Sequence, residues 1–250
     1  MNRCDDFSKM YEISGLLNRI STFLFGLNTV VAFAALYLPD YIGGLLMEAQ
    51  VFSALAYVLI SVIDDVFFWF KAESGRRKNC IEDAFAIELL ESKNNGYYNN
   101  AATPSIMRYA LNNYESAYYS RSTSQKMLPK SVIKTVVAIM AFLISWRAVK
   151  NGGIVLSVAQ TLFSSVFLLD TITLCIYAFR VSRICDDFYT LLISEGGPLT
   201  PPKEALLLSY SVEYEAIKAF YKIRLDQKIF SKNRHNLSQC WDELVAKIEI

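Results

Sequence analysis

The feature that most constrains this chain is a set of long apolar stretches without charged residues. Ile20–Leu38 supplies 19 consecutive residues without a charge, and a helix needs about 20 apolar residues to cross roughly 30 Å of hydrocarbon. The 250-residue chain is 53% hydrophobic, which is high for a water-soluble domain of this size. A soluble bundle of very apolar helices is the alternative, but buried soluble helices rarely run so far uncharged. We therefore expect these stretches to lie in a bilayer.

Three further stretches are predicted to cross the membrane. Ala49–Phe70 returns after a short turn, and Ile154–Phe179 is long enough to span even when tilted. Ser131–Val149 has a shorter uncharged centre. It reaches membrane length only if Lys134 and Arg147 extend their charged ends toward the headgroups. Four transmembrane helices are expected, in two hairpins.

The distribution of Lys and Arg predicts the orientation of these helices. There are three before the first span, none between the first two, ten from Lys71 to Lys134, two between the last two, and ten from Arg180 onward. Regions rich in Lys and Arg stay in the cytoplasm. The chain is thus expected to be a multi-pass protein of the cell inner membrane, with both termini cytoplasmic and both hairpin turns outside.

The expected fold class is all-α, an integral membrane protein with cytoplasmic helical segments. The predicted divisions are an N-terminal cytoplasmic helix (1–19), transmembrane hairpin 1 (20–70), a cytoplasmic helical segment (71–130), transmembrane hairpin 2 (131–179) and a cytoplasmic helical tail (180–250).

Helical periodicity places four helices in the cytoplasmic parts. Cys80–Leu90 and Pro104–Tyr119 are separated by Asn- and Gly-containing turns. In the tail, a helix is expected to run from Arg180 to Leu192 and to end before the break at 196–202. A second helix, Lys203–Phe230, has one apolar or aromatic face, which favours packing over ligand binding.

Composition argues against several classes of function. The net charge is only +1 and gives no field for nucleic acid. A single histidine, His235, and five cysteines without a CxxC pair predict no metal site, no disulfide framework and no cofactor. Most hydrolytic sites need an imidazole base, so we expect the chain not to be an enzyme.

Two polar stripes follow predicted spans at helical spacing. They are the pore-lining candidates, Gln50, Ser53, Tyr57, Ser61 and Asp64 on the second span, and Ser157, Gln160, Ser164 and Thr171 on the fourth. One interpretation is a water-filled lumen formed by several subunits. The other is contact between helices, because small polar residues are common at membrane helix interfaces.

Asp170 is a further pore-lining candidate, since a carboxylate in hydrocarbon normally faces a bundle interior, a cavity or a basic partner. Asp64 and Asp65 lie near the cytoplasmic end of the second span. A ring of such carboxylates across subunits would favour cations. The alternative is pairing with Lys134 or Lys71 or, for Asp65, simple exposure at the membrane interface.

The central segment interleaves tyrosines with arginines and asparagines, a mixture that can stack a base and hold phosphate. The ligand-binding candidates are Arg108, Tyr109, Asn113, Tyr114, Tyr118 and Arg121. Tyrosines at helical spacing are also typical of packing, and no glycine-rich phosphate loop is present. The basic stretch 76–78 is interpreted as a contact with anionic lipid.

Nearly the whole chain shares a layout with a known family. A short helix (Tyr11–Arg19) precedes a tight pair of spans, a helical segment, a second pair and a helical tail. Local similarities are the polar-aromatic stretch Asn113–Arg121 ahead of the third span and, in the tail, Ile229–Phe230, Arg234 and Trp241. This layout resembles the SMODS-associated four-transmembrane family of pore-forming effectors, which belong to bacterial cyclic-oligonucleotide antiphage defence (CBASS).

The resemblance implies a homo-oligomeric pore that a nucleotide second messenger opens, with loss of inner-membrane integrity. A partner nucleotidyltransferase would make that cyclic nucleotide. The alternative function is a non-conducting membrane sensor or scaffold that recruits a soluble partner through its tail. A small secondary transporter is less favoured, because no proline lies within a predicted span and glycines do not interrupt the spans in pairs.

Overall fold

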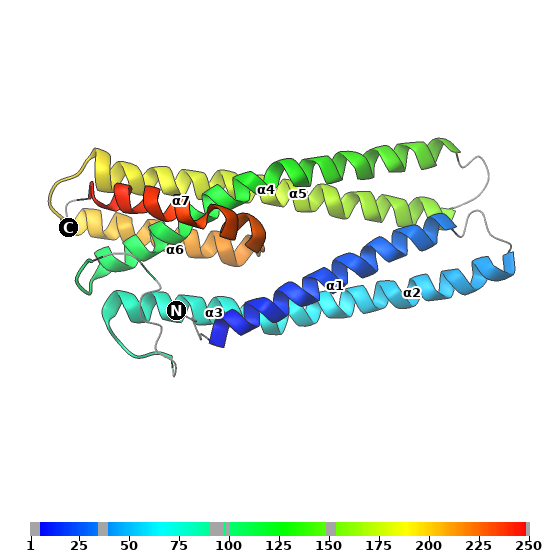
Figure 1. The fold of residues 1–250 in the computed structure, drawn as a ribbon, viewed down its shortest axis with the longest axis horizontal. Coiled ribbons are helices and arrows are strands. Elements are labelled where there is room, and N and C mark those ends of the chain that lie inside the picture. Colours follow the sequence, from blue (N-terminus) through cyan, green and yellow to red (C-terminus); the bar gives the residue numbers. More distant parts are fainter. Residues whose placement is uncertain (1–5, 35–39, 91–97, 99–100, 149–153, 249–250) are drawn as a thin grey trace. The chain divides into compact units, whose positions relative to one another are not determined.

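The computed structural model describes residues 6–34, 40–90, 98, 101–148 and 154–248. It does not describe the side chains of residues 6, 8, 28–29, 32–34, 40–41, 43–44, 47, 50, 141–142, 144–148 and 154–167. The described residues contain helices and no strand, so the predicted all-α class is confirmed for them. The elements, shown in Figure 1, are α1 (Asp6–Ala34), α2 (Asp40–Ile63), the π-helix η1 (Asp64–Trp69), α3 (Phe70–Phe85), α4 (Ile106–Ala148), α5 (Ile154–Tyr189), the π-helix η2 (Thr190–Ser194), α6 (Pro201–Tyr221) and α7 (Gln227–Val245).

The chain forms two compact units. The first consists of Arg76–Ile133 and Leu169–Ile250 and is called the core unit below. The second consists of Asn2–Gly75 and Lys134–Leu168 and is called the hairpin unit. Both units combine segments that are far apart in the sequence, so each depends on long-range packing.

An aromatic centre holds the core unit together. The Tyr114 ring of α4 stacks on Phe188 of α5, with ring centroids 5.1 Å apart, and meets the edge of Trp241 of α7, also at 5.1 Å. All three side chains are buried, as is Tyr214 of α6. Each aromatic pair adds about 0.5–1.5 kcal/mol beyond the burial of its surface. Helices α4 to α7 therefore share one core.

The predicted helix Lys203–Phe230 is wrong, because the structure divides it into α6 and α7. Lys222 ends α6 in the left-handed region, at φ 48°. The Asp226 side chain then accepts hydrogen bonds from the backbone N–H groups of Lys228 (2.9 Å) and Ile229 (3.3 Å). This cap satisfies amide groups that would otherwise lack partners and starts a new helix.

The hairpin unit packs α1 against α2, η1 and the start of α3. The Tyr11 hydroxyl donates to Glu73 Oε1 at 2.6 Å, and the Tyr11 ring meets the edge of Trp69 at 5.7 Å. Phe7 lies so close to Gly75 that a Cβ on the glycine would be 2.7 Å from Phe7 Cβ. The absence of a side chain at Gly75 thus permits this close approach.

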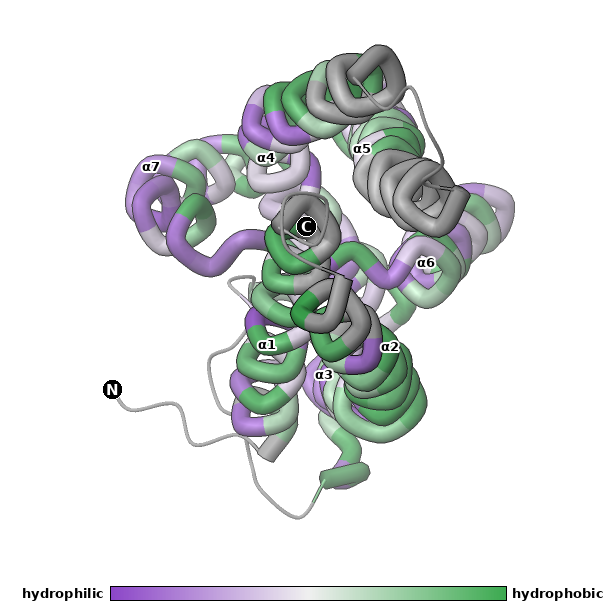
Figure 2. Tube along the Cα trace, turned by 90° about the vertical axis from the view of Figure 1, so that its right-hand side faces the viewer, coloured by the Kyte–Doolittle hydropathy of each residue, from purple (hydrophilic) through white to green (hydrophobic). Residues whose placement is uncertain are grey.

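The outer surface of the hairpin unit is apolar. Phe23 of α1 is 68% exposed and Phe52 of α2 is 72% exposed, and Figure 2 shows hydrophobic colouring along most of α2. Within the described part of the chain, one helical stretch, Val51–Phe85, is long and apolar enough to cross a membrane by length and composition. It contains most of the predicted second span.

Candidate functional site

Charged and polar side chains from α3, α4 and α6 meet inside the core unit. The residues of this polar cluster are Arg76, Asn79, Cys80, Asp83, Arg108, Tyr109, Asn112, Asn113 and Glu215. Positions three and four apart share one face of a helix, so each helix turns its polar residues toward the others. Buried charges and amides in such number need partners, because desolvation otherwise disfavours them strongly.

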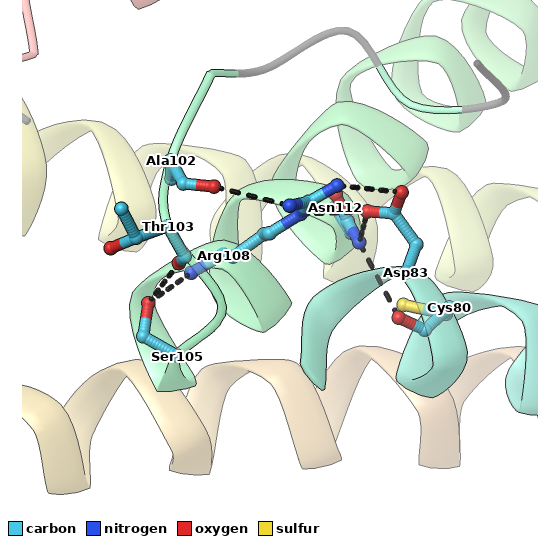
Figure 3. A network of polar contacts seen from close by, with 7 residues as sticks. All are labelled: Cys80, Asp83, Ala102, Thr103, Ser105, Arg108 and Asn112. Atoms are coloured by element: carbon cyan, nitrogen blue, oxygen red, sulfur yellow. Dashed lines mark hydrogen bonds and ion pairs between the residues drawn. The ribbon is translucent and has the colours of Figure 1, made fainter. Parts of the chain in front are cut away.

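Asp83 of α3 is the acceptor for two side chains of α4, as Figure 3 shows. Arg108 binds it through two nitrogens, Nε to Oδ2 at 3.1 Å and Nη2 to Oδ1 at 2.9 Å. Asn112 Nδ2 donates to Asp83 Oδ2 at 2.9 Å and to the carbonyl oxygen of Cys80 at 3.4 Å. Arg108 also donates to the Ala102 carbonyl at 3.3 Å. This network joins the end of α3 to the beginning of α4.

An ion pair joins α3 to α6 on the other side of the cluster. Arg76 Nη2 lies 2.5 Å from Glu215 Oε2, and the two side chains are only 5% and 12% exposed. A pair this buried gives little net stability, because removing both charges from water offsets most of their attraction. Either charge alone would be strongly disfavoured there, so the two residues depend on each other.

Cys80 lies between these two arrangements. Asn113 Nδ2 is 3.6 Å from the Cys80 Sγ atom and donates to the Tyr109 carbonyl at 2.9 Å. Burial raises the pKa of the Cys80 thiol to about 12, although a hydrogen bond with Tyr98 and the charge of Arg76 lower it in part. Burial likewise raises the pKa of Tyr109 to about 12. A neutral, buried thiol is a poor nucleophile, so Cys80 has a structural role.

Asn79 Nδ2, Asn113 Oδ1 and Glu215 Oε1 are buried polar atoms of the cluster without a hydrogen-bond partner among the described residues. Leaving such an atom unsatisfied costs about 1–3 kcal/mol, and buried polar groups of this kind are usually satisfied by water or by a ligand. The cluster is therefore suited to binding a small polar group.

The charged groups of the cluster are paired with one another. Among the described residues, no group of three or more His, Cys, Asp or Glu side chains is placed to hold a metal ion. The carboxylates of Asp83 and Glu215 are each held by an arginine. Glu215 keeps one oxygen, Oε1, without a hydrogen-bond partner among the described residues, so this oxygen can accept a hydrogen bond from a polar ligand.

The predicted ligand-binding residues lie in three different places. Arg108, Tyr109 and Asn113 belong to the polar cluster. Tyr114 is 1% exposed in the aromatic centre, and Tyr118 packs on Trp241 with ring centroids 5.8 Å apart.

Arg121, the sixth of these candidates, pairs instead with Asp186 of α5, at 2.9 Å. The Arg121 side chain is 36% exposed and that of Asp186 is 65% exposed. This surface ion pair is separate from the hydrogen bonds described for the polar cluster. Ligand contact stays a prediction for all six residues.

Predicted pore-lining residues of the second span face α1. The Tyr57 ring lies 5.6 Å from that of Phe25, and the Ser61 and Ser21 hydroxyls are 3.5 Å apart. Asp64 is buried and Ser53 is half-buried. The contacts of Tyr57 and Ser61 join helices to each other, and a role in a lumen stays a prediction.

Among the fourth-span candidates, the structure describes the side chains only at the C-terminal end of the predicted span. Thr171 is buried, and its hydroxyl lies 2.7 Å from that of Ser131 on α4. Asp170 is exposed. The side chains of Gln50, Ser157, Gln160 and Ser164 lie outside the described residues.

Sequence reasoning missed Arg76, Asn79, Asp83 and Glu215. The basic stretch 76–78 predicts a lipid contact for Arg76, yet Arg76 is 4% exposed and pairs with Glu215. The spacing of Arg76, Asn79 and Asp83 on one helical face was a usable signal. Its meaning depends on Glu215, which is 139 residues away.

Comparisons of this chain with family models, with curated proteins and with solved structures give no match.

Proposed function

We propose that this chain is a homo-oligomeric, multi-pass membrane effector whose polar cluster senses a small polar signal and whose spans then permeabilise the inner membrane. The observation that carries the proposal is continuity of the helices. Residues 40–85 are helical throughout, from α2 through η1 to α3, and α4 runs unbroken from Ile106 to Ala148. Helices that hold the cluster therefore also include predicted transmembrane residues.

Support for four spans comes from sequence and exposure together. The chain has four long apolar stretches. Large apolar side chains are exposed on predicted spans outside Val51–Phe85 as well, among them Phe23, Val137 at 62% and Leu169 at 59%. In water such a surface would be unfavourable, whereas a bilayer covers it.

The signal acts through the unsatisfied polar atoms. A ligand that supplies partners to Asn79, Asn113 and Glu215 binds better to a state in which α3, α4 and α6 open around it. Ligand binding shifts an equilibrium only by this difference in affinity, and a few kcal/mol suffices to change the dominant state. The resemblance to the SMODS-associated family favours a cyclic oligonucleotide as that ligand, from a partner nucleotidyltransferase.

The alternative is a non-conducting sensor or scaffold that recruits a soluble partner through its tail. Contacts of Tyr57, Ser61 and Thr171 with neighbouring helices favour it, because they are those of tightly packed helices. The two functions differ in one measurable property, which is the permeability of the membrane after the signal binds.

Dye release from liposomes that contain the purified full-length protein tests the proposal. Cyclic oligonucleotides should release the dye from vesicles with the parent protein. The Asn79→Leu variant should release at least tenfold less, because it removes a polar atom of the cluster. Lys78→Ala, an exposed neighbour on α3, is the matched control and should release dye like the parent.

Two results would contradict the effector function. Reconstituted, folded protein that never releases dye with any cyclic oligonucleotide favours the scaffold. Equal loss in Asn79→Leu and Lys78→Ala shows that the polar cluster is not the sensing site.

A further inference from the structure

The end of α6 lies beside the end of the predicted fourth span. The Tyr221 ring is 6.4 Å from the ring of Tyr177, and Arg180 Cζ is 5.6 Å from the centre of the Tyr221 ring. Tyr177 belongs to the last turn of the predicted span 154–179, and Arg180 is the first residue beyond it. Tyr221 is thus at the depth where that span would leave the hydrocarbon.

The segment that follows α6 lies beside the start of the predicted third span. Lys130 Nζ is 3.8 Å from Asp226 Oδ2, and the Asp226 backbone N–H donates to the Met127 sulfur at 3.3 Å. Lys130 is the residue directly before the predicted span 131–149. The α6–α7 turn, residues 222–226, therefore lies where both predicted spans meet the cytoplasm.

The side chains at this place are those that membrane interfaces prefer. Phe220 is 78% exposed, more than Phe179 at the end of the predicted span, which is 71% exposed. Lys222 and Arg224 follow two and four residues later, and Lys222 is exposed. Aromatic rings at headgroup level, with Lys or Arg next to phosphates, are typical of such interfaces.

Lys222 ends α6 in an unusual backbone conformation. Its φ of 48° lies in the left-handed region, where glycine is strongly favoured because a Cβ is disfavoured. A side chain at this position costs some backbone strain, and the Lys222 side chain lies at the turn, two residues after the exposed Phe220.

We propose that Phe220, Lys222 and Arg224 form an interfacial anchor that binds the cytoplasmic leaflet of the bilayer. The Phe220 ring inserts at the boundary of headgroups and acyl chains, and the two cations bind the phosphates of anionic phospholipids. The anchor rests on the membrane placement of the proposed function. It adds a lipid-binding site on the tail, and it ties the α6 helix, which holds Glu215, to the membrane surface.

Fluorescence quenching in vesicles tests the anchor on the full-length chain. Cys4, Cys175 and Cys240 are replaced by Ser, while the buried Cys80 and Cys185 stay. A polarity-sensitive label is then attached at Phe220→Cys. Lipids with a nitroxide near the headgroup should quench it by half or more. Leu208→Cys is the matched control, because Leu208 is exposed on the same helix but about 18 Å farther along it, and it should be quenched little.

A third label position separates failure of the anchor from failure of the proposed function. Ile172 is 44% exposed and lies within the predicted fourth span. Quenching at Ile172→Cys without quenching at Phe220→Cys would overturn the anchor while the membrane placement stands. Lack of quenching at both positions would overturn both proposals.

The cations are tested by the lipid composition. Quenching at position 220 should rise with the mole fraction of phosphatidylglycerol in phosphatidylcholine vesicles. Lys222→Gly and Arg224→Ala should each raise the half-maximal fraction about fivefold, the effect of one cation near an anionic surface. Because glycine suits the left-handed turn, Lys222→Gly keeps the fold. A half-maximal fraction equal to that of the parent in both variants would overturn the role of the cations.

Discussion

The guanidinium of Arg76 on α3 donates to the carboxylate of Glu215 on α6 at 2.5 Å, with both side chains almost removed from water. This contact connects two segments separated by 139 positions in the sequence. It also fixes the polar cluster on one side, as Asp83 and Arg108 do on the other. Breaking such a buried pair by removing one partner leaves an uncompensated charge.

Arg76→Met should destabilise the core unit by about 3 kcal/mol. The double variant Arg76→Met with Glu215→Leu should recover most of that loss, because no lone charge remains. Thermal unfolding in detergent, followed by circular dichroism, measures both. If the loss of stability in the double variant equals the sum of the losses in the two single variants, the two charges do not interact.

High pH should destabilise the core unit through its buried thiols. Burial raises the pKa of Cys80 and of Cys185 from 9.0 to about 12, so the folded state holds both protons more tightly than the unfolded chain does. Their contribution to stability is complete below about pH 9 and is lost as pH rises toward 12. A second measurement uses maleimide at pH 7. The exposed Cys240 should react at least a hundredfold faster than the buried Cys80 and Cys185. Fast labelling of Cys80 in the folded protein would contradict its burial.

Asn79→Leu should leave the stability of the core unit unchanged or raise it by about 1 kcal/mol. The substitution removes a buried donor that has no partner among the described residues and puts an apolar group of similar size in its place. The melting temperature in detergent, compared with that of Lys78→Ala, measures the effect. A large loss of stability would mean that the Asn79 amide is already satisfied in the folded protein.

Thr171→Val should weaken the contact between α4 and α5. The Thr171 hydroxyl lies 2.7 Å from that of Ser131, and hydrogen bonds between membrane helices contribute about 0.6 kcal/mol on average. Ser131→Ala is the matched variant, and the double variant should lose no more than either single one. If Thr171→Val keeps its melting temperature but alters ion flux, the residue lines a lumen instead.

The all-α class followed from the sequence because long apolar stretches and helical periodicity are local properties. The division between α6 and α7 was not predictable in the same way. Lys222 ends α6 in the left-handed conformation, and the usual sequence sign of such a helix end is a glycine. Asp226 as a helix cap was visible in principle. The polar cluster depends on Glu215 reaching Arg76 from a distant helix, which periodicity within α3 does not reveal.

The central prediction for this chain is that four stretches cross the bilayer as two hairpins with their turns outside. Gly152→Cys, placed in the predicted outer turn and treated on intact cells with a membrane-impermeant maleimide, measures this. The cysteine at position 152 should react, whereas Cys240, exposed on α7 and predicted to be cytoplasmic, should react only after the cells are lysed. Protection of position 152 in intact cells, or labelling of both positions alike, would contradict the membrane topology.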